Sequence, residues 1–206
     1  MSCLLSVALE EEANGVPIKE IEHVFYAKIV DLEQLKRAAS KERQEQWELR
    51  IPKTPKNAGT GSVRIRKTVK EGAEPEFVLT TKVKLGEKDG KLELAIPSNE
   101  DNFNQFRFLS EVGMIKDRFA FPVENSELVW EIDVYLDPEG KYYPWCKIDL
   151  EVKDKDNAIP DFPIDLDEVI APEGYGENTV EDREGFVRKL YDDYFITSNQ
   201  FLNETE

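Results

Sequence analysis

The sequence is poor in the residues and segments that define several common classes of protein. It contains two cysteines and one histidine among 206 residues. Cys3 and Cys146 provide neither a disulfide framework nor a zinc-binding spacing, and the lack of a second histidine argues against a histidine-based metal site. No apolar run approaches the ~20 residues of a membrane-spanning helix. The first residues also lack the basic segment of a secretion signal. We therefore expect a cytoplasmic protein with no membrane partner.

Motifs of common nucleotide-binding and hydrolytic enzymes are also missing. No P-loop, no GxGxxG segment and no nucleophile-elbow serine or cysteine occurs. The 43 acidic and 27 basic residues give a formal net charge of -16, which argues against nucleic-acid binding through surface charge. The length suits a single domain. We predict it over residues 19–206, after an N-terminal extension, residues 1–18, that is either a short helix or disordered.

Against this acidic background, residues 62–84 concentrate positive charge. They have the pattern of two strands joined by a loop, with Arg64 and Arg66 in the first strand and Lys82 and Lys84 in the second. Side chains two residues apart point to the same face of a strand, so each strand presents a cationic pair on one face and apolar residues on the other. Such a face needs a counter-charge, either from carboxylates in the fold or from an anionic ligand.

Other predicted strands carry pairs of like charge at the same spacing. The pairs are Glu20 with Glu22, Lys116 with Arg118, and Asp149 with Glu151. A sheet with its polar face in solvent explains each strand taken alone, but solvated faces are expected to mix charges of both signs. Like charges at this spacing repel unless each pair faces its opposite or a ligand. A barrel with a charged interior meets that condition.

The whole pattern predicts an α+β fold, in which about eight strands close into an antiparallel β-barrel, or tunnel, with a charged lumen. Helices are expected to cover the apolar outer face of the barrel. They are predicted over residues 32–46, from Ser98 or Asn99 to Gly113, and from Thr179 onward. Residues 154–178 are predicted to form a loop.

Taken in order, these motifs resemble the CYTH superfamily, the triphosphate tunnel metalloenzymes, which includes class IV adenylyl cyclases, thiamine triphosphatases and inorganic triphosphatases. The resemblance runs from about Lys19 to the predicted final helix. It rests on the acidic strand with Glu20 and Glu22, the Arg64/Arg66 strand, Thr80 with Lys82 and Lys84, Lys91 with Glu93, the Lys116/Arg118 pair, the segment WEIDVYLDPEG, and the strand with Asp149 and Glu151. Two positions depart from the family pattern: Val24 stands in place of a lysine, and Ala95 in place of a second glutamate.

The resemblance implies a role for each charged group. Phosphate oxygens would be bound by Arg64, Arg66, Lys82, Lys84, Lys91, Lys116 and Arg118. A Mg²⁺ or Mn²⁺ ion would be held by Glu20, Glu22, Asp149 and Glu151, and the catalytic groups would be Glu22, Glu93 and Glu151. These roles agree with chemistry, because arginine and lysine suit phosphate oxygens and hard divalent ions prefer carboxylates.

We therefore predict a divalent-metal-dependent hydrolase of a triphosphate-containing small molecule, whether inorganic, nucleoside or related organic, acting as a monomer or homodimer. Two alternatives stay open. One is a class IV-type nucleotidyl cyclase, in which the nucleotide's own hydroxyl attacks. The other is a non-catalytic nucleotide- or polyphosphate-binding protein, which Val24 and Ala95 favour. The sequence has no base-reading motif that would select one triphosphate.

Overall fold

A computed structural model describes residues 21–51, 61–84, 91–110, 112–137, 139–152, 158–170 and 196–197. These residues form an antiparallel sheet of ten strands, with a 3₁₀ helix and an α-helix. The strands are β1 (Ile21–Ile29), β2 (Ser40–Ile51), β3 (Gly61–Lys70), β4 (Glu76–Lys84), β5 (Lys91–Pro97), β6 (Val112–Pro122), β7 (Val129–Leu136), β8 (Tyr142–Val152), β9 (Leu166–Ile170) and β10 (Ile196–Thr197). The helices are η1 (Leu32–Arg37) and α2 (Glu100–Leu109). Neither is long and apolar enough to cross a membrane.

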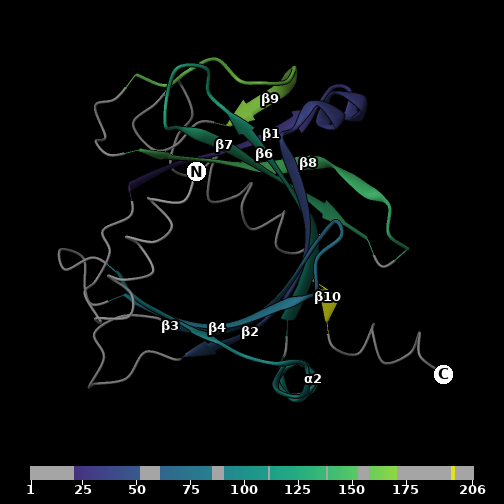
Figure 1. The fold of residues 1–206 in the computed structure, drawn as a ribbon, viewed down its shortest axis with the longest axis vertical. Coiled ribbons are helices and arrows are strands. Elements are labelled where there is room, and N and C mark those ends of the chain that lie inside the picture. The colour runs from purple at the N-terminus through teal and green to yellow at the C-terminus, as the bar shows by residue number, and fades with distance from the viewer. Residues whose placement is uncertain are drawn as a thin grey trace.

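The sheet is strongly curved. Its strand order is β5-β4-β3-β2-β6-β7-β8-β1-β9, with β10 beside β6. In Figure 1 the strands β3 and β4 form one arm of the curve and β7 and β8 the other; α2 lies outside the first arm and η1 outside the second. The predicted antiparallel sheet is confirmed. The predicted closed barrel is not confirmed, because within the described residues no hydrogen bonds join the edge strands β5 and β9.

Apolar side chains occupy the outer, convex face of the sheet in two clusters. The larger cluster lies on β1, β6, β7 and β8 under η1 and residues 159–169, and it includes Phe25, Trp130, Ile132 and Ile148. The smaller cluster packs Trp47 and Ile65 against Phe103 of α2. Since side chains alternate along a strand, the charged residues between these core positions lie on the inner, concave face.

Strand β2 replaces most of the helix predicted over residues 32–46, so that part of the prediction is wrong. Only η1 is helical there, and its N-cap Asp31 accepts a hydrogen bond from the Glu33 backbone N–H at 2.9 Å. From Ser40 onward the chain pairs with both β3 and β6. The lysine, glutamate, glutamine and arginine residues of this stretch favour helix locally, but pairing with two neighbouring strands overrides that weak preference.

Helix α2 confirms the helix predicted after Ser98, although it ends earlier than predicted. The Asn99 side chain caps it, accepting a hydrogen bond from the Asn102 backbone N–H at 2.9 Å. Gly113 does not end the helix but lies inside β6, opposite Trp47 of β2. A Cβ at this position would lie 2.5 Å from the Trp47 ring, so the close packing of the indole requires glycine.

Most strand predictions are confirmed. Strands β1, β3, β4, β5, β6, β7 and β8 all fall where the alternation of polar and apolar residues indicates them. Strand β9 lies within residues 154–178, which the sequence predicts as a loop, and it pairs with β1. The predicted extension, residues 1–18, and the predicted last helix from Thr179 lie outside the described residues.

Candidate phosphate-binding face

Charged side chains from five neighbouring regions of the sheet gather on the concave face. They come from β3 (Arg64, Arg66), β4 and β5 (Lys82, Glu93), β6 (Lys116, Arg118), β7 (Glu131, Asp133) and β8 (Lys147, Asp149). The residues next to these charges in each strand point to the opposite, convex face. Ile65, Ile132 and Ile148 are examples, and they belong to the two apolar clusters. The strand alternation that buries the apolar residues therefore directs these charges to one side.

A buried ion network occupies the β6–β7 part of this face. Asp133 is fully buried and accepts hydrogen bonds from Arg118, from Nε at 2.7 Å and from Nη2 at 2.9 Å. Lys116 Nζ donates to the same carboxylate. Burial opposes ionisation of Asp133, but the charge of Lys116 and the hydrogen bonds from Arg118 outweigh it and hold the pKa of Asp133 well below its usual range. Burial lowers the pKa of Lys116 to about 8 in spite of that partner.

Two more carboxylates extend the network. Arg118 Nη1 contacts Glu131 Oε2, and its Nη2 lies 3.8 Å from Asp149 Oδ2. Lys147 Nζ donates to Asp149 at 2.5 Å. Burial raises the pKa of Glu131, and the charges of Asp133 and Asp149 add to that rise while Arg118 opposes it. Cations and carboxylates on this arm thus neutralise one another within the protein.

On the β3–β5 arm, Glu93 is the shared carboxylate. Lys82 Nζ lies 2.5 Å from Glu93 Oε2, and Arg64 Nη2 lies 3.8 Å from Glu93 Oε1. Strand register explains this grouping, because Lys82 pairs with Glu93 across β4 and β5. The predicted phosphate ligands Arg64 and Lys82 and the predicted catalytic Glu93 therefore lie together.

Arg66 differs from the other cations of the concave face. Among the described residues it forms no ion pair within 4.0 Å, whereas Arg64, Lys82, Lys116 and Arg118 all do. Burial lowers the pKa of Arg66, and the like charges of Arg64 and Arg118 lower it further, while Glu42 and Asp133 oppose the shift. Its guanidinium is still charged at neutral pH. A positive group that is partly desolvated, close to other cations and without an ion pair among the described residues is well placed to bind an anion.

Several predicted site residues are described only by their backbone or not at all. Glu22 pairs with Glu151 across β1 and β8, and Lys84 pairs with Lys91 across β4 and β5. The Glu151 side chain is exposed. Glu20 lies outside the described residues, as do the side chains of Glu22, Lys84 and Lys91.

The described carboxylates alone do not make up a divalent-metal site. No group of three or more His, Cys, Asp or Glu side chains in the described part of the chain is placed to hold a metal ion. Asp133 is enclosed by Lys116 and Arg118, and Asp149 is bound to Lys147. These oxygens serve as counter-ions for cations, so the prediction of a Mg²⁺ or Mn²⁺ site stays a prediction.

Sequence reasoning missed several members of this face. Glu131 and Lys147 were not assigned to the site, although each shares its strand face with an acidic residue two positions away, Asp133 and Asp149. That spacing was the signal that could have identified them. Gln44 and Gln46, both buried, were missed because β2 was predicted as a helix.

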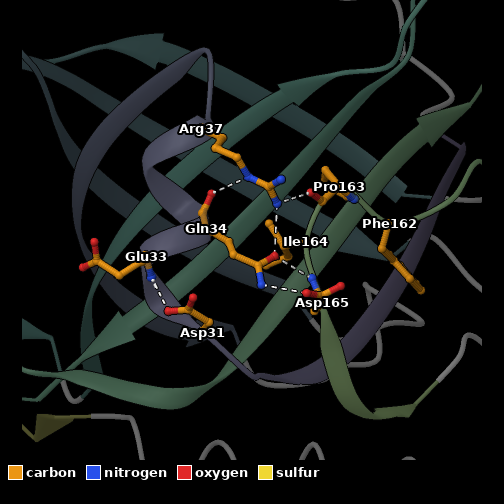
Figure 2. Close-up of a pocket in the computed structure, with 8 residues that line it drawn as sticks. All are labelled: Asp31, Glu33, Gln34, Arg37, Phe162, Pro163, Ile164 and Asp165. Carbon is orange, nitrogen blue, oxygen red and sulfur yellow. Dashed lines mark hydrogen bonds between the residues drawn. The ribbon is translucent and has the colours of Figure 1, made fainter.

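A separate pocket of about 530 Å³ lies between η1 and residues 162–165. Figure 2 shows its polar groups bonded to one another: Gln34 donates to Asp165 at 2.8 Å and accepts from the Asp165 backbone N–H at 2.9 Å. Arg37 donates to the Pro163 carbonyl at 2.9 Å. These bonds attach the segment before β9 to η1.

Comparisons with known proteins leave the family open. No family model matches the sequence, and no curated protein matches it. The crystal structure of the hypothetical protein NE1496 shares 19% identity with a TM-score of 0.46, covering 76% of this chain and 92% of that chain. A candidate adenylate cyclase, bh2851 from Bacillus halodurans, shares 17% identity with a TM-score of 0.39, covering 66% of this chain and 81% of that chain. At these TM-scores neither similarity carries an argument about activity.

Proposed function

We propose that the concave face binds the phosphate chain of a small triphosphate-containing molecule and that the protein hydrolyses this chain with the help of a divalent metal. The observation that carries the proposal is Arg66, the cation that lies between Arg64 and Arg118 and forms no ion pair among the described residues. A guanidinium offers planar pairs of donors that match phosphate oxygens. An anion bound there would offset the repulsion of Arg66 by Arg64 and Arg118.

The other cations extend this binding site in two directions. Arg64 and Lys82 lie on the β3–β5 side, and Arg118 lies on the β6 side. A triphosphate carries several negative charges along its length, and a row of cations suits it better than a single cation does. In hydrolysis, a water molecule attacks the terminal phosphorus, the bond to the leaving diphosphate breaks, and the water proton passes to a carboxylate. Glu93, next to Arg64 and Lys82, is our candidate for that acceptor.

The proposed Mg²⁺ or Mn²⁺ ion would add positive charge to the phosphate chain. We keep Glu20, Glu22, Asp149 and Glu151 as its proposed ligands, with Glu22 and Glu151 also proposed as catalytic. Replacing Glu22 or Glu151 by glutamine keeps the shape and removes the charge. We expect each variant to lose metal-dependent hydrolysis by at least about tenfold.

Binding is tested first. Thermal stabilisation by inorganic tripolyphosphate and by a nucleoside triphosphate is measured for the wild type, for Arg66→Ala and for Lys67→Ala as a matched control. Lys67 is the next residue of β3 and stacks on Phe77, with Nζ 5.9 Å from the ring centroid on the outer face. We expect Arg66→Ala to lose most of the stabilisation and Lys67→Ala to keep it. Equal stabilisation in the two variants would rule out Arg66 as the anion-binding group.

Turnover is tested by product analysis with Mg²⁺, Mn²⁺ or a chelator. Released phosphate supports the hydrolase, whereas cyclic nucleotide with pyrophosphate would identify a cyclase. Binding without any product would identify a non-catalytic binding protein. The non-catalytic binding protein is the second candidate function. It is favoured by Val24, which pairs with Asp149 and stands where the family pattern has a lysine.

A further inference from the structure

A buried hydrogen-bond acceptor lies in the middle of the concave face without a donor. Gln44 is 1% exposed, and its Nε2 donates to Glu42 Oε1 at 2.5 Å. That hydrogen bond fixes the orientation of the amide, because a carboxylate accepts only from the nitrogen end. The carbonyl oxygen, Gln44 Oε1, is buried, and no described residue donates to it. Buried acceptors in folded proteins are nearly always satisfied, so this one calls for a water molecule or a ligand.

The strand register places Gln44 between the two arginines of the proposed site. On β2, Gln46 pairs with Arg66 of β3, and Glu42 pairs with Arg118 of β6. Gln44 stands between them on the same face of β2 and pairs with Lys116. An anion that contacts both Arg66 and Arg118 must therefore cross the strand at Gln44.

We propose that Gln44 contacts the ligand and that its Oε1 accepts a hydrogen bond from a hydroxyl group of that ligand. This inference rests on the proposed function and narrows its substrate class. Phosphate oxygens at neutral pH are acceptors, so a bare phosphate chain would place oxygen against oxygen at this point. An organic triphosphate that carries a hydroxyl group near its phosphate chain supplies the missing donor. Inorganic triphosphate does not supply it.

The test compares two nucleotides that differ only in hydroxyl groups, with inorganic tripolyphosphate as a third ligand. Dissociation constants are measured by calorimetry for a ribonucleoside triphosphate, for its 2′,3′-dideoxy analogue and for inorganic tripolyphosphate. We expect the wild type to bind the ribonucleotide about tenfold more tightly than the dideoxy analogue, the effect of one buried hydrogen bond. Equal affinity for these two nucleotides would overturn the inference. This comparison needs no variant.

A pair of variants then assigns the preference to one residue. Gln44→Met keeps an unbranched side chain but has no carbonyl oxygen, and Gln46→Met makes the same change two residues along the same face. We expect Gln44→Met to bind the ribonucleotide and the dideoxy analogue equally, and Gln46→Met to keep the wild-type preference. A Gln44→Met variant that retains the preference would overturn the role of Gln44.

The outcomes also separate this inference from the proposed function. If the wild type binds none of the three compounds, the proposed function fails and the inference fails with it. If tripolyphosphate and both nucleotides bind equally well, the triphosphate site stands, and Gln44 Oε1 is satisfied by water alone.

Discussion

Replacing Asp133 by asparagine should weaken both the fold and the organisation of the concave face. Asp133 is fully buried and is the carboxylate that binds Lys116 and Arg118 together. Asparagine keeps the size of the side chain but removes the negative charge. Its amide nitrogen would also face a donor, because both carboxylate oxygens of Asp133 accept hydrogen bonds. Two cations would then lose their main counter-charge in a poorly solvated place.

The size of the effect follows from this environment. Removing one partner of a buried ion pair costs about 3–5 kcal/mol. The low end applies, because Arg118 would still contact Glu131 and lie 3.8 Å from Asp149. We therefore expect a loss of about 3 kcal/mol out of a total stability of roughly 5–15 kcal/mol. At about 2–4 °C per kcal/mol for a chain of this size, Tm should fall by about 6–12 °C.

Urea denaturation of the wild type, Asp133→Asn and Asp165→Asn measures this loss. Asp165 is an exposed carboxylate that accepts one hydrogen bond from Gln34, so its variant should change stability by no more than about 0.5 kcal/mol. A loss below about 1 kcal/mol for Asp133→Asn would refute the reasoning that the buried cations depend on this carboxylate.

Four further predictions concern three residues, Lys116, Gly113 and Cys146. Burial lowers the pKa of Lys116 to about 8, so the affinity of the concave face for an anion should fall as the pH rises through that value. In anion titrations on either side of pH 8, Lys116→Arg should remove most of this pH dependence. Between about pH 8 and 10.5 the unfolded chain binds a proton at Lys116 that the folded chain has lost, so the contribution of this residue to stability rises with pH in that range. Urea denaturation across this pH range should therefore show the free energy of unfolding of the wild type rising relative to that of Lys116→Met. Gly113→Ala should lower stability by about 1–3 kcal/mol in urea denaturation, because its Cβ would lie 2.5 Å from the Trp47 ring, and an unchanged midpoint would contradict that packing. Cys146 is fully buried, and burial raises the pKa of its thiol to about 12. In a Cys3→Ser variant, Cys146 should therefore react with a thiol reagent only after the protein unfolds. Labelling of the native protein as fast as that of the unfolded protein would contradict this.

Strand alternation was the part of the fold that the sequence predicted well. The charged pairs at Arg64/Arg66 and Lys116/Arg118 alternate with core residues, and the structure places both pairs on the concave face as expected. The same alternation at Asp149 is confirmed, with Ile148 in the apolar core. Local periodicity was enough here, because each strand buries one face.

The errors arose where a residue's role depends on distant partners. Gln44 and Gln46 lie in a stretch of helix-favouring residues, and only the pairing of β2 with β3 and β6 makes it a strand. Gly113 was assigned to a helix end, because the approach of Trp47 from another strand is invisible in the sequence. The sequence predicts Asp149 as a metal ligand, whereas its nearest described partner is Lys147, two residues away on the same strand. The spacing of like charges identifies a charged face but does not say which charges neutralise one another.

The arginines on the two arms of the concave face therefore differ in how many of their hydrogen-bond donors are already used within the protein. Arg118 uses three contacts on Asp133 and Glu131, through Nε, Nη2 and Nη1. A guanidinium has five N–H donors, so Arg118 can add donors to a ligand without leaving Asp133. Arg66, with no described carboxylate partner, has more to gain from an incoming anion. An anion should bind first at Arg66, which forms no ion pair with a described carboxylate, and then reach Arg118, which Asp133 already holds in a fixed orientation. Asp133 thus contributes to binding without touching the ligand, because a fixed guanidinium loses less side-chain freedom on binding than a mobile one.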